Sequence, residues 1–370
     1  MDISPNTPAM FALLKKLVET ESPSTDKAAV DRVGAIVAAE ARSLGADVEI
    51  LPSVTTGDHV LSRWGQGSGG ILLLCHMDTV FPLGTLQKIP YRQDGEKTFG
   101  PGTLDMKSGI VIALQAVAML KAAGQMPARP ITLLCTSDEE IGSDTSVAHI
   151  ERLAKQSALV LVLESALLDG SLKTWRKGVG EFEIKITGRA AHSGGEHEKG
   201  RNAIEELSHQ VLAIQKLTDY AKGTTVNIGT IRGGIATNVV PDEAVAMGDL
   251  RILDPAEEGR IMTALRALKP MLDGTTISVS GSLNRPPMPF DATMAATFEH
   301  AREIAATIGV TLKAGGSGGG SDANFVAPLG IPVLDGLGAI GEGYHSEREF
   351  FFTESLPERA RLLAALLRDW

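Results

Sequence analysis

"RPITLLCTSDEE", residues 129–140, sets a continuous apolar run directly against three acidic side chains. An apolar run without alternation is typical of a strand covered on both faces of a parallel sheet. Asp138, Glu139 and Glu140 repel one another at the end of such a strand, unless some are protonated or a cation neutralises them. The stretch therefore predicts a buried strand and raises the question of a metal ion.

Two further apolar runs extend this pattern along the chain. "GGILLLCHMD" (69–78) precedes the opening stretch, and "ALVLVLES" (158–165) follows it. Between the first two runs, residues 105–124 read as a mostly buried helix that ends at Gly124. Strand, helix and strand in this order predict an α/β fold with a mostly parallel sheet and helices on both faces.

Residues 178 to about 287 follow a different pattern. "GEFEIKIT" (180–187) alternates polar and apolar residues, as a half-buried strand does, and amphipathic helical and strand segments follow it. Their order, β-α-β-β-α-β, is the ferredoxin-like arrangement. We therefore predict an inserted α+β domain over 177–287, between two halves of a catalytic domain at 1–176 and 288–370.

The composition excludes some classes of protein. The 370 residues carry a net charge of −10, whereas binding to nucleic acid or an anionic membrane surface favours a basic face. No run of eighteen apolar residues predicts a transmembrane helix, and the N-terminal residues do not resemble a signal peptide. With only two cysteines, Cys75 and Cys135, both in apolar strands, we expect a cytoplasmic protein.

Each of the three apolar runs ends in potential metal ligands. His76 and Asp78 follow the first run, the three acids follow the second, and Glu164 ends the third. Ligands of open α/β sheets bind at the carboxyl ends of the strands, so these side chains should meet in one crevice. Histidines and carboxylates without thiolates favour zinc, cobalt or manganese. A single acid is more often a solvated loop charge, but acids at three strand ends favour a metal centre of one ion, or of two ions around one water.

Several motifs together resemble the di-zinc metallopeptidases. This group includes bacterial glutamate carboxypeptidase, aminoacylase-1 and succinyl-diaminopimelate desuccinylase, and the resemblance is greatest to the folate-cleaving glutamate carboxypeptidases. It covers nearly the whole chain. The motifs, in chain order, are "HMDTV" (76–80), "GPGTLDMKSG" (100–109), "DEEIGS" (138–143), "LES" (163–165), "AHSG" (191–194), "ATNVVPDEA" (236–244), "DLR" (249–251), "GGGSDAN" (318–324) and "YHSEREF" (344–350).

The resemblance implies two zinc ions per subunit, with cobalt or manganese as possible replacements. By this resemblance His76, Asp105 and Glu164 hold one ion. Asp105, Glu140 and His345 hold the other, so that Asp105 bridges the pair.

The resemblance also assigns the residues around the ions. Glu139 is the implied general base and acid, and Asp78 the implied partner that fixes the tautomer of the His76 imidazole. If residues 139 and 140 lie in an extended segment, their side chains point opposite ways, one to the metal and one to the water. The resemblance further implies a cis peptide bond between Asp105 and Met106.

The inserted domain supplies the implied dimer contacts and part of the substrate site. His192 is implied to reach the partner's active site in a homodimer and to stabilise the oxyanion. Asn238 and Arg251 resemble residues that hold the free carboxylate of the substrate, a task suited to the planar guanidinium. Gly319 and Gly320 belong to a glycine-rich loop that is implied to line the pocket.

We expect metal-dependent hydrolysis of an amide bond that releases a C-terminal amino acid, glutamate first. An N-acyl amino acid deacylase or desuccinylase on the same scaffold is the alternative, because Met106 and Ser165 depart from the folate-cleaving pattern. A metal-stabilised binding protein without catalysis would lack the base, and Glu139 is present. A nucleotide-binding enzyme would rest on the glycine stretch 315–320 alone, which lacks the G-x-G-x-x-G context.

Overall fold

The protein is described by a computed structural model that covers residues 4–370. The chain forms two compact units. The first comprises residues 4–175, Phe290–Ser317 and Ser321–Trp370, and the second comprises Arg176–Pro289 with Gly318–Gly320. These boundaries lie next to the predicted ones, except that the glycines 318–320 belong with the second unit.

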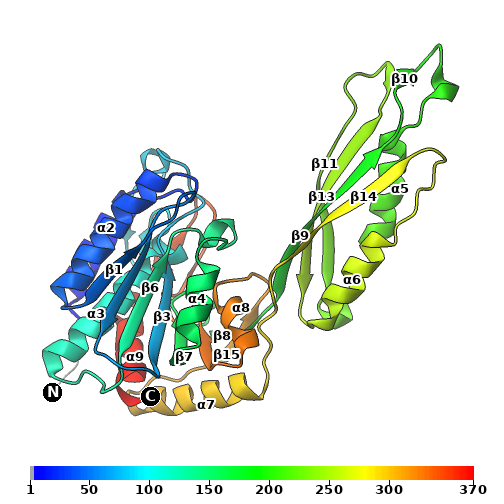
Figure 1. Ribbon diagram of the computed structural model, residues 1–370. Coiled ribbons are helices and arrows are strands. Elements are labelled where there is room, and N and C mark those ends of the chain that lie inside the picture. Colours follow the sequence, from blue (N-terminus) through cyan, green and yellow to red (C-terminus); the bar gives the residue numbers. More distant parts are fainter. Residues whose placement is uncertain (1–3) are drawn as a thin grey trace. The chain divides into compact units, whose positions relative to one another are not determined.

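The first unit contains an eight-stranded sheet with the order β1-β2-β6-β3-β7-β16-β8-β15 (Figure 1). The strands are β1 (Asp47–Leu51), β2 (His59–Trp64), β3 (Gly70–His76), β6 (Ile131–Thr136), β7 (Ser157–Val162), β8 (Leu172–Arg176), β15 (Ala314–Ser317) and β16 (Val333–Asp335). The three predicted apolar strands are β3, β6 and β7, and they lie side by side and parallel. Every residue of β3 and β6 is buried, as expected of strands covered on both faces.

The edges of this sheet are antiparallel, so the sheet is mixed rather than mostly parallel throughout. β1 pairs antiparallel with β2, and β2 antiparallel with β6. For β1 and β2 the reason is local, because the link between them is too short for the crossover that parallel strands need. The parallel centre, β6-β3-β7-β16, carries the site described below.

Helices lie on both faces of the sheet (Figure 1). They are α1 (Thr7–Glu19), α2 (Lys27–Ser43), α3 (Ser108–Ala123), α4 (Val147–Ala154), α7 (Ala292–Thr307), α8 (Ala323–Val326) and α9 (Ser355–Asp369). As predicted, α3 is mostly buried and Gly124 ends it in the left-handed conformation, with φ 66°. The segment Thr103–Ala123 is long and apolar enough to span a membrane, but 72% of its most apolar window is buried inside the protein.

A small sheet in the first unit has the order β17-β18-β5-β4. It contains β4 (Arg92–Asp94), β5 (Lys97–Phe99), β17 (Gly341–Glu342) and β18 (Phe350–Phe352). β17 and β18 pair antiparallel, and the segment between them carries His345. The pairing of these two strands holds both ends of the segment that contains His345, the last predicted ligand in the chain.

The second unit has the predicted ferredoxin-like order. Its elements are β9 (Gly178–Thr187), β10 (Ala191–His192), α5 (Ala203–Gln215), β11 (Thr225–Gly233), β12 (Val239–Val240), β13 (Glu243–Ile252), α6 (Ala256–Arg266) and β14 (Thr276–Arg285). The sheet order is β11-β13-β9-β14, and β10 pairs separately with β12. Alternate residues of β13 are buried, and the core includes Phe182, Leu207 and Ile261.

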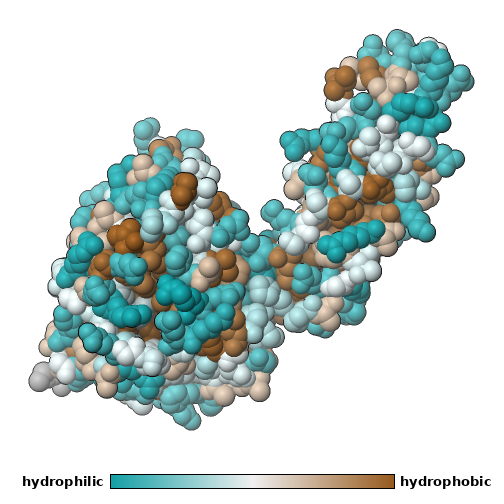
Figure 2. Space-filling view, viewed as in Figure 1, coloured by the Kyte–Doolittle hydropathy of each residue, from teal (hydrophilic) through white to brown (hydrophobic). Residues whose placement is uncertain are grey.

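Hydrophobic side chains remain exposed on the second unit, among hydrophilic ones (Figure 2). Four of them come from α5, β11 and the segment that follows β11: Ile204, Leu212, Ile231 and Ile235. β11 is an edge strand of its sheet, and most of its residues are exposed. An exposed edge strand is a template for pairing with another chain.

Candidate metal centre

The five predicted ligands come from five separate segments of the first unit. His76 is the last residue of β3, and Glu164 follows the end of β7 at Val162. Glu140 lies in a short turn after β6, and Asp105 in an irregular turn before α3. His345 lies between β17 and β18. Because the carboxyl ends of β3, β6 and β7 meet at one edge of the sheet, these segments converge there.

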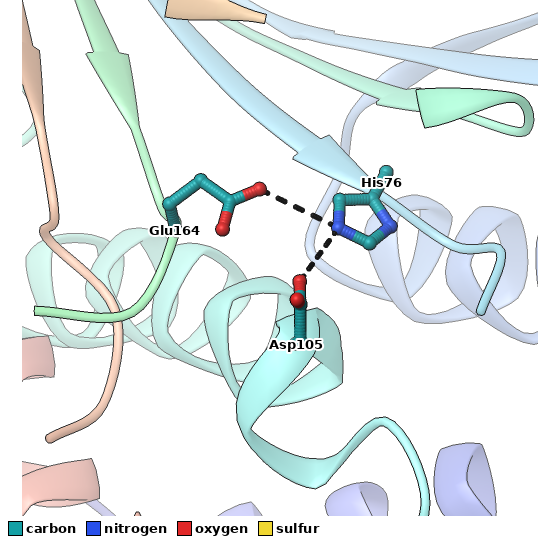
Figure 3. Close-up of side chains that lie close together, drawn as sticks. All are labelled: His76, Asp105 and Glu164. Atoms are coloured by element: carbon teal, nitrogen blue, oxygen red, sulfur yellow. Dashed lines mark hydrogen bonds and ion pairs between the residues drawn. The ribbon is translucent and has the colours of Figure 1, made fainter. Parts of the chain in front are cut away.

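The first group that could hold a metal ion is His76, Asp105 and Glu164 (Figure 3). The Nε2 atom of His76 lies 3.0 Å from Oδ1 of Asp105 and 3.4 Å from Oε1 of Glu164. The three ligand atoms lie within 4.8 Å of one another. One nitrogen and two carboxylate oxygens at this spacing suit a divalent metal such as zinc.

The second group is Asp105, Glu140 and His345. The Nε2 atom of His345 lies 3.2 Å from Oδ2 of Asp105 and 3.0 Å from Oε2 of Glu140. Asp105 thus turns one carboxylate oxygen towards each histidine. The two groups share this residue, and its position is that of a bridge between two cations.

The charges of the two groups favour a cation at each. Contact with Asp105 and then Glu140 raises the pKa of His345 to about 11. Burial alone would lower the pKa of His76, but hydrogen bonds with the surrounding carboxylates, Asp105 first, raise it well above its usual value. Burial and the neighbouring Asp105 raise the pKa of Glu140 to about 7. The carboxylates therefore stabilise positive charge where the imidazole nitrogens point, and the donor set fits zinc or a similar ion.

The backbone at His345 lies in the left-handed region, with φ 60°. A residue with a Cβ atom adopts this conformation at a cost of the order of 1–3 kcal/mol. The imidazole reaches Asp105 and Glu140 from this position. The peptide bond between Asp105 and Met106 is cis, as the family resemblance implied.

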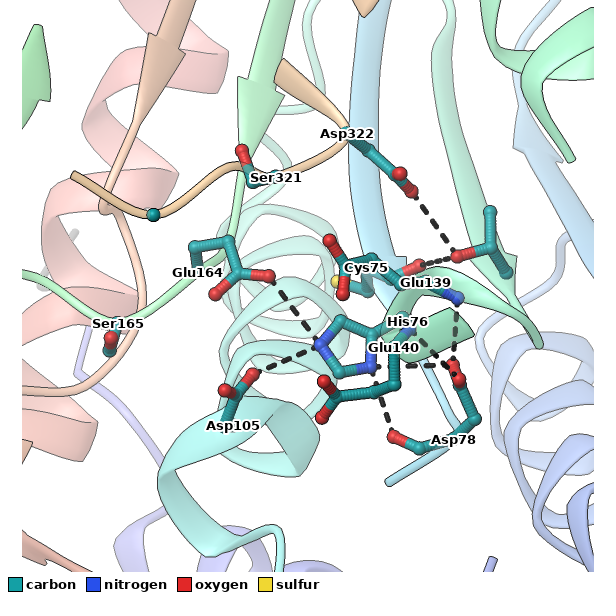
Figure 4. A network of polar contacts seen from close by, with 12 residues as sticks. Cys75, His76, Asp78, Asp105, Glu139, Glu140, Glu164, Ser165, Ser321 and Asp322 are labelled. Carbon is teal, nitrogen blue, oxygen red and sulfur yellow. Dashed lines mark hydrogen bonds and ion pairs between the residues drawn. The ribbon is translucent and has the colours of Figure 1, made fainter. Parts of the chain in front are cut away.

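Asp78 supports the first group from behind (Figure 4). The Nδ1 atom of His76 contacts the main-chain oxygen of Asp78 at 3.0 Å and its Oδ1 atom at 3.4 Å. These contacts place the ring proton on Nδ1 and leave Nε2 for a metal. Ser24 and the backbone N–H groups of Glu139 and Glu140 also donate to the Asp78 carboxylate. Although burial raises the pKa of Asp78, the hydrogen bonds, His76 first, hold it below its usual value.

Glu139 lies beside the ligand set, next to Glu140 in the chain (Figure 4). The two residues belong to a single 3-10 turn, Glu139–Ile141, and not to an extended segment. The extended backbone that would point the two side chains opposite ways is therefore not present, because such a turn rotates successive side chains by about 120°. Both backbone N–H groups of the pair bind Asp78, which ties Glu139 to the same framework as the ligands.

The predicted substrate residues belong to the second unit, not to the first. His192 accepts hydrogen bonds at Nδ1 from the backbone N–H groups of Gly194 and Gly195, at 3.2 and 3.1 Å. This assigns the ring proton to Nε2, which is then a donor. The side chain is exposed. It has the tautomer that stabilising an oxyanion requires.

Asn238 and Arg251 lie at opposite ends of the sheet in the second unit. Asn238 accepts at its main-chain oxygen from Ser193, beyond the Glu243 end of β13. Arg251 is near the other end, where it binds both carboxylate oxygens of Asp249. The strand from Glu243 to Arg251 spans about 26 Å at its usual rise. One chain cannot therefore use both residues on one carboxylate.

Gly319 and Gly320 have a structural partner. Nη1 of Arg176 donates to the main-chain oxygen atoms of both glycines, at 3.0 Å each. This contact holds the glycine-rich loop to the second unit. Arg176 therefore has a structural function at this loop.

Two residues near the ligands were missed by the sequence interpretation. Ser24 donates to Oδ2 of Asp78 at 2.7 Å. Glu349, within the "YHSEREF" motif, is fully buried and accepts from the backbone of the Asp105 turn. An acid directly before the apolar strand Phe350–Phe352 and four residues after a candidate ligand histidine was a usable signal for Glu349, whereas nothing in the sequence marks Ser24.

A cavity of about 490 Å³ lies beside the ligands in the first unit. Ser165 and Tyr344 line its walls, and they are the chain neighbours of Glu164 and His345. Leu168 and Tyr344 are about half exposed on these walls. Lys173 and Arg348 add positive charge. The cavity has room for part of a substrate that is bound at the metal centre.

A mixed α/β sheet with two overlapping histidine–carboxylate groups and an adjacent glutamate defines a metal-dependent hydrolase. The chain belongs to peptidase family M20/M25/M40, whose profile matches residues 72–369. It is accordingly a metallopeptidase, a hydrolase that acts on peptide bonds, and the family resemblance seen in the sequence is confirmed.

Individual relatives support this assignment. The chain is 32% identical to Carboxypeptidase G2 from Pseudomonas sp. (strain RS-16), over 98% of this chain and 89% of that protein. Aminopeptidase PepT from Bacillus cereus ATCC 10987 has the same fold, with a TM-score of 0.79 and 24% identity over 98% of both chains. So does the YXEP protein of Bacillus subtilis, described as a dinuclear metal binding peptidase, with a TM-score of 0.68 and 16% identity over 98% of this chain and 97% of that one.

Proposed function

We propose that this chain is a di-zinc carboxypeptidase that releases a C-terminal amino acid, glutamate first, from a dipeptide-like or N-acylated substrate. The observation that carries the proposal is Asp105, which turns one oxygen to His76 and the other to His345. This arrangement favours two cations over one. The similarity to Carboxypeptidase G2 supports the release of a C-terminal residue.

In the proposed mechanism each residue has a separate function in hydrolysis. When bound, the zinc ions polarise the substrate carbonyl and the attacking water. Glu139 accepts the proton of that water and passes it to the leaving amine. Asp78 keeps the His76 ring in its tautomer during these steps. In the homodimer proposed below, His192 of the other copy donates from Nε2 to the oxygen of the tetrahedral intermediate.

A deacylase that removes a bulky acyl group is the second candidate function. The cavity beside Glu164 and His345 favours it, because Leu168 and Tyr344 offer apolar surface for an acyl group. One screen separates the two functions: amine release from N-acyl amino acids in which the amino acid and the acyl group vary independently. Rates that follow the amino acid, with glutamate highest, support the carboxypeptidase, and rates that follow the acyl group support the deacylase.

We also propose that the enzyme is a homodimer through the second unit. The exposed edge strand β11 and the side chains of Ile204, Leu212 and Ile231 favour pairing with a second copy. The separation of Asn238 from Arg251 supports it too, because a dimer can bring the Asn238 of one chain to a substrate held by the Arg251 of the other.

Light scattering tests the dimer. Ile231→Lys on the edge strand should give a monomer, while Ile50→Lys, at a similarly exposed isoleucine of the first unit, should leave the dimer intact. His192→Ala should lower kcat without changing the metal content. A monomer with full activity would contradict the proposal.

We finally propose a cytoplasmic location. Cys75 and Cys135 lie opposite each other on adjacent strands, and both are free thiols. Two cysteines on adjacent strands are close enough that an oxidising compartment would favour a disulfide between them, whereas a reducing compartment keeps both thiols free. Fractionation of cells that express the full chain, followed by thiol labelling of the denatured protein, tests this, and recovery outside the cytoplasm would contradict it.

A further inference from the structure

Glu349 is a buried acid close to the metal ligands. Its side chain has no exposed surface. Oε2 accepts a hydrogen bond from the N–H group of Gly102 at 2.9 Å, and Oε1 accepts from those of Leu104 and Asp105 at 2.7 and 3.1 Å. A buried carboxylate needs such partners, because an isolated buried charge is strongly unfavourable.

The three donors belong to the turn that presents Asp105. Within this turn Asp105 has φ −118° and ψ 94°, so the backbone is not helical there. N–H groups in an irregular turn lack the regular partners of a helix or strand, and a buried one without a partner is costly. The Glu349 carboxylate satisfies three groups of this kind, those of Gly102, Leu104 and Asp105, and thereby fixes the direction of the Asp105 side chain.

The same residue belongs to the segment that presents His345. Ser346 donates from its backbone N–H to Gly343, and Glu349 donates likewise to Ser346, at 3.1 and 3.2 Å. These turns make the chain from 343 to 349 a short, closed segment. Glu349 therefore joins the two segments whose side chains meet at Nε2 of His345 and Oδ2 of Asp105, 3.2 Å apart.

We propose that Glu349 is a positioning residue of the metal centre, which sets the spacing of the ligands Asp105 and His345 without contacting a metal itself. The inference rests on the proposed metal centre, but not on the substrate. The hydrogen bonds that this buried side chain accepts would thus set the affinity for the cation between the two ligands.

Glu349→Gln is the decisive variant. Its amide oxygen can take the place of Oε1 and keep the hydrogen bonds to Leu104 and Asp105. Its NH2 group then faces the N–H of Gly102, donor against donor, so one of the three bonds is lost. We expect about a tenfold loss of zinc affinity for Gln and about a hundredfold loss for Glu349→Ala, the range for residues that orient metal ligands.

The control is Glu347→Gln, which removes an exposed acid from the same segment. We would measure zinc affinity of the full chain by competition with a chromophoric chelator, and the visible absorption of the cobalt-loaded protein. We expect weaker zinc binding and a shifted cobalt spectrum for Glu349→Gln, with kcat lowered more than KM is raised, and no change for Glu347→Gln.

The proposal is overturned if Glu349→Gln binds zinc within twofold of the parent and keeps its cobalt spectrum, even if its melting temperature falls. It is overturned too if Glu347→Gln has an equal effect, since net charge would then explain the loss. If Glu349→Ala does not fold, the Gln variant still decides. Zinc affinity needs no substrate, so an error in the proposed glutamate specificity would leave this test unaffected.

Discussion

Replacing Asp78 with Asn should weaken zinc binding even though the residue is not itself a ligand. The Asp78 carboxylate is fully buried. Oδ1 faces Nδ1 of His76 at 3.4 Å and the N–H of Glu139 at 3.3 Å. Oδ2 accepts from Ser24 at 2.7 Å and from the N–H of Glu140 at 3.2 Å. One carboxylate thus holds a ligand histidine and the turn that carries a ligand glutamate.

The magnitude follows from these contacts. Asn keeps one oxygen, which is best placed towards His76 and Glu139. Its NH2 group then faces Ser24, whose hydroxyl can rotate to accept, and the N–H of Glu140, which cannot. One hydrogen bond to a charged group is lost, worth about 1.5–3 kcal/mol, and His76 loses a charged partner. This corresponds to roughly a 10- to 100-fold loss of zinc affinity, at about 1.4 kcal/mol per factor of ten.

Competition with a chromophoric chelator at neutral pH measures this loss. Ser24→Ala is the graded control, because it removes the donor at 2.7 Å but keeps the carboxylate charge. We expect less than a tenfold effect for it. Zinc affinity within twofold of the parent for Asp78→Asn, or an equal loss for Ser24→Ala, would refute the reasoning.

Three other predictions follow from the described contacts. Glu139→Gln should bind zinc normally but lose at least about 100-fold in kcat, the low end for a general base, and normal turnover would remove Glu139 from the mechanism. A chelator should abolish activity and added zinc should restore it, so chelator-resistant turnover would exclude the metal mechanism. Hydrogen bonds from Arg260 first, and from Lys222, lower the pKa of Glu257 to about 2 against an ordinary 4.5. The stabilising effect of the ionised Glu257 should be complete above pH 4.5 and decline as the pH falls towards 2. The melting temperatures of Glu257→Gln and the parent should therefore differ at pH 7 and converge in acid. A difference that stays constant with pH would be inconsistent with this ion pair.

The sequence predicted the central strands because their signal is local. In β3, β6 and β7 each apolar run is unbroken, and burial on both faces explains why. Two of the candidate ligands could be predicted for the same reason, since His76 and Glu164 lie at or just beyond the ends of those runs. The antiparallel edge strand β1, by contrast, has mostly exposed residues and no such pattern.

Contacts between distant residues could not be predicted in this way. Glu349 binds the N–H of Gly102, 247 residues away, and Ser24 binds Asp78, 54 residues away. Neither contact leaves a periodic trace in the chain, because each depends on single residues that are far apart in the sequence. The turn at Glu139–Ile141 shows a second limit: a few polar residues after a strand do not reveal whether the backbone stays extended.

Asp105 offers one oxygen to each group of ligands, and this sharing has a consequence for how the enzyme is assembled. The first ion to arrive would orient a carboxylate that the second also needs, so the two loading steps cannot be independent. A titration of the apoenzyme should therefore deviate from the curve for two separate sites. By the same reasoning Asp105→Ala would remove a ligand from both ions at once.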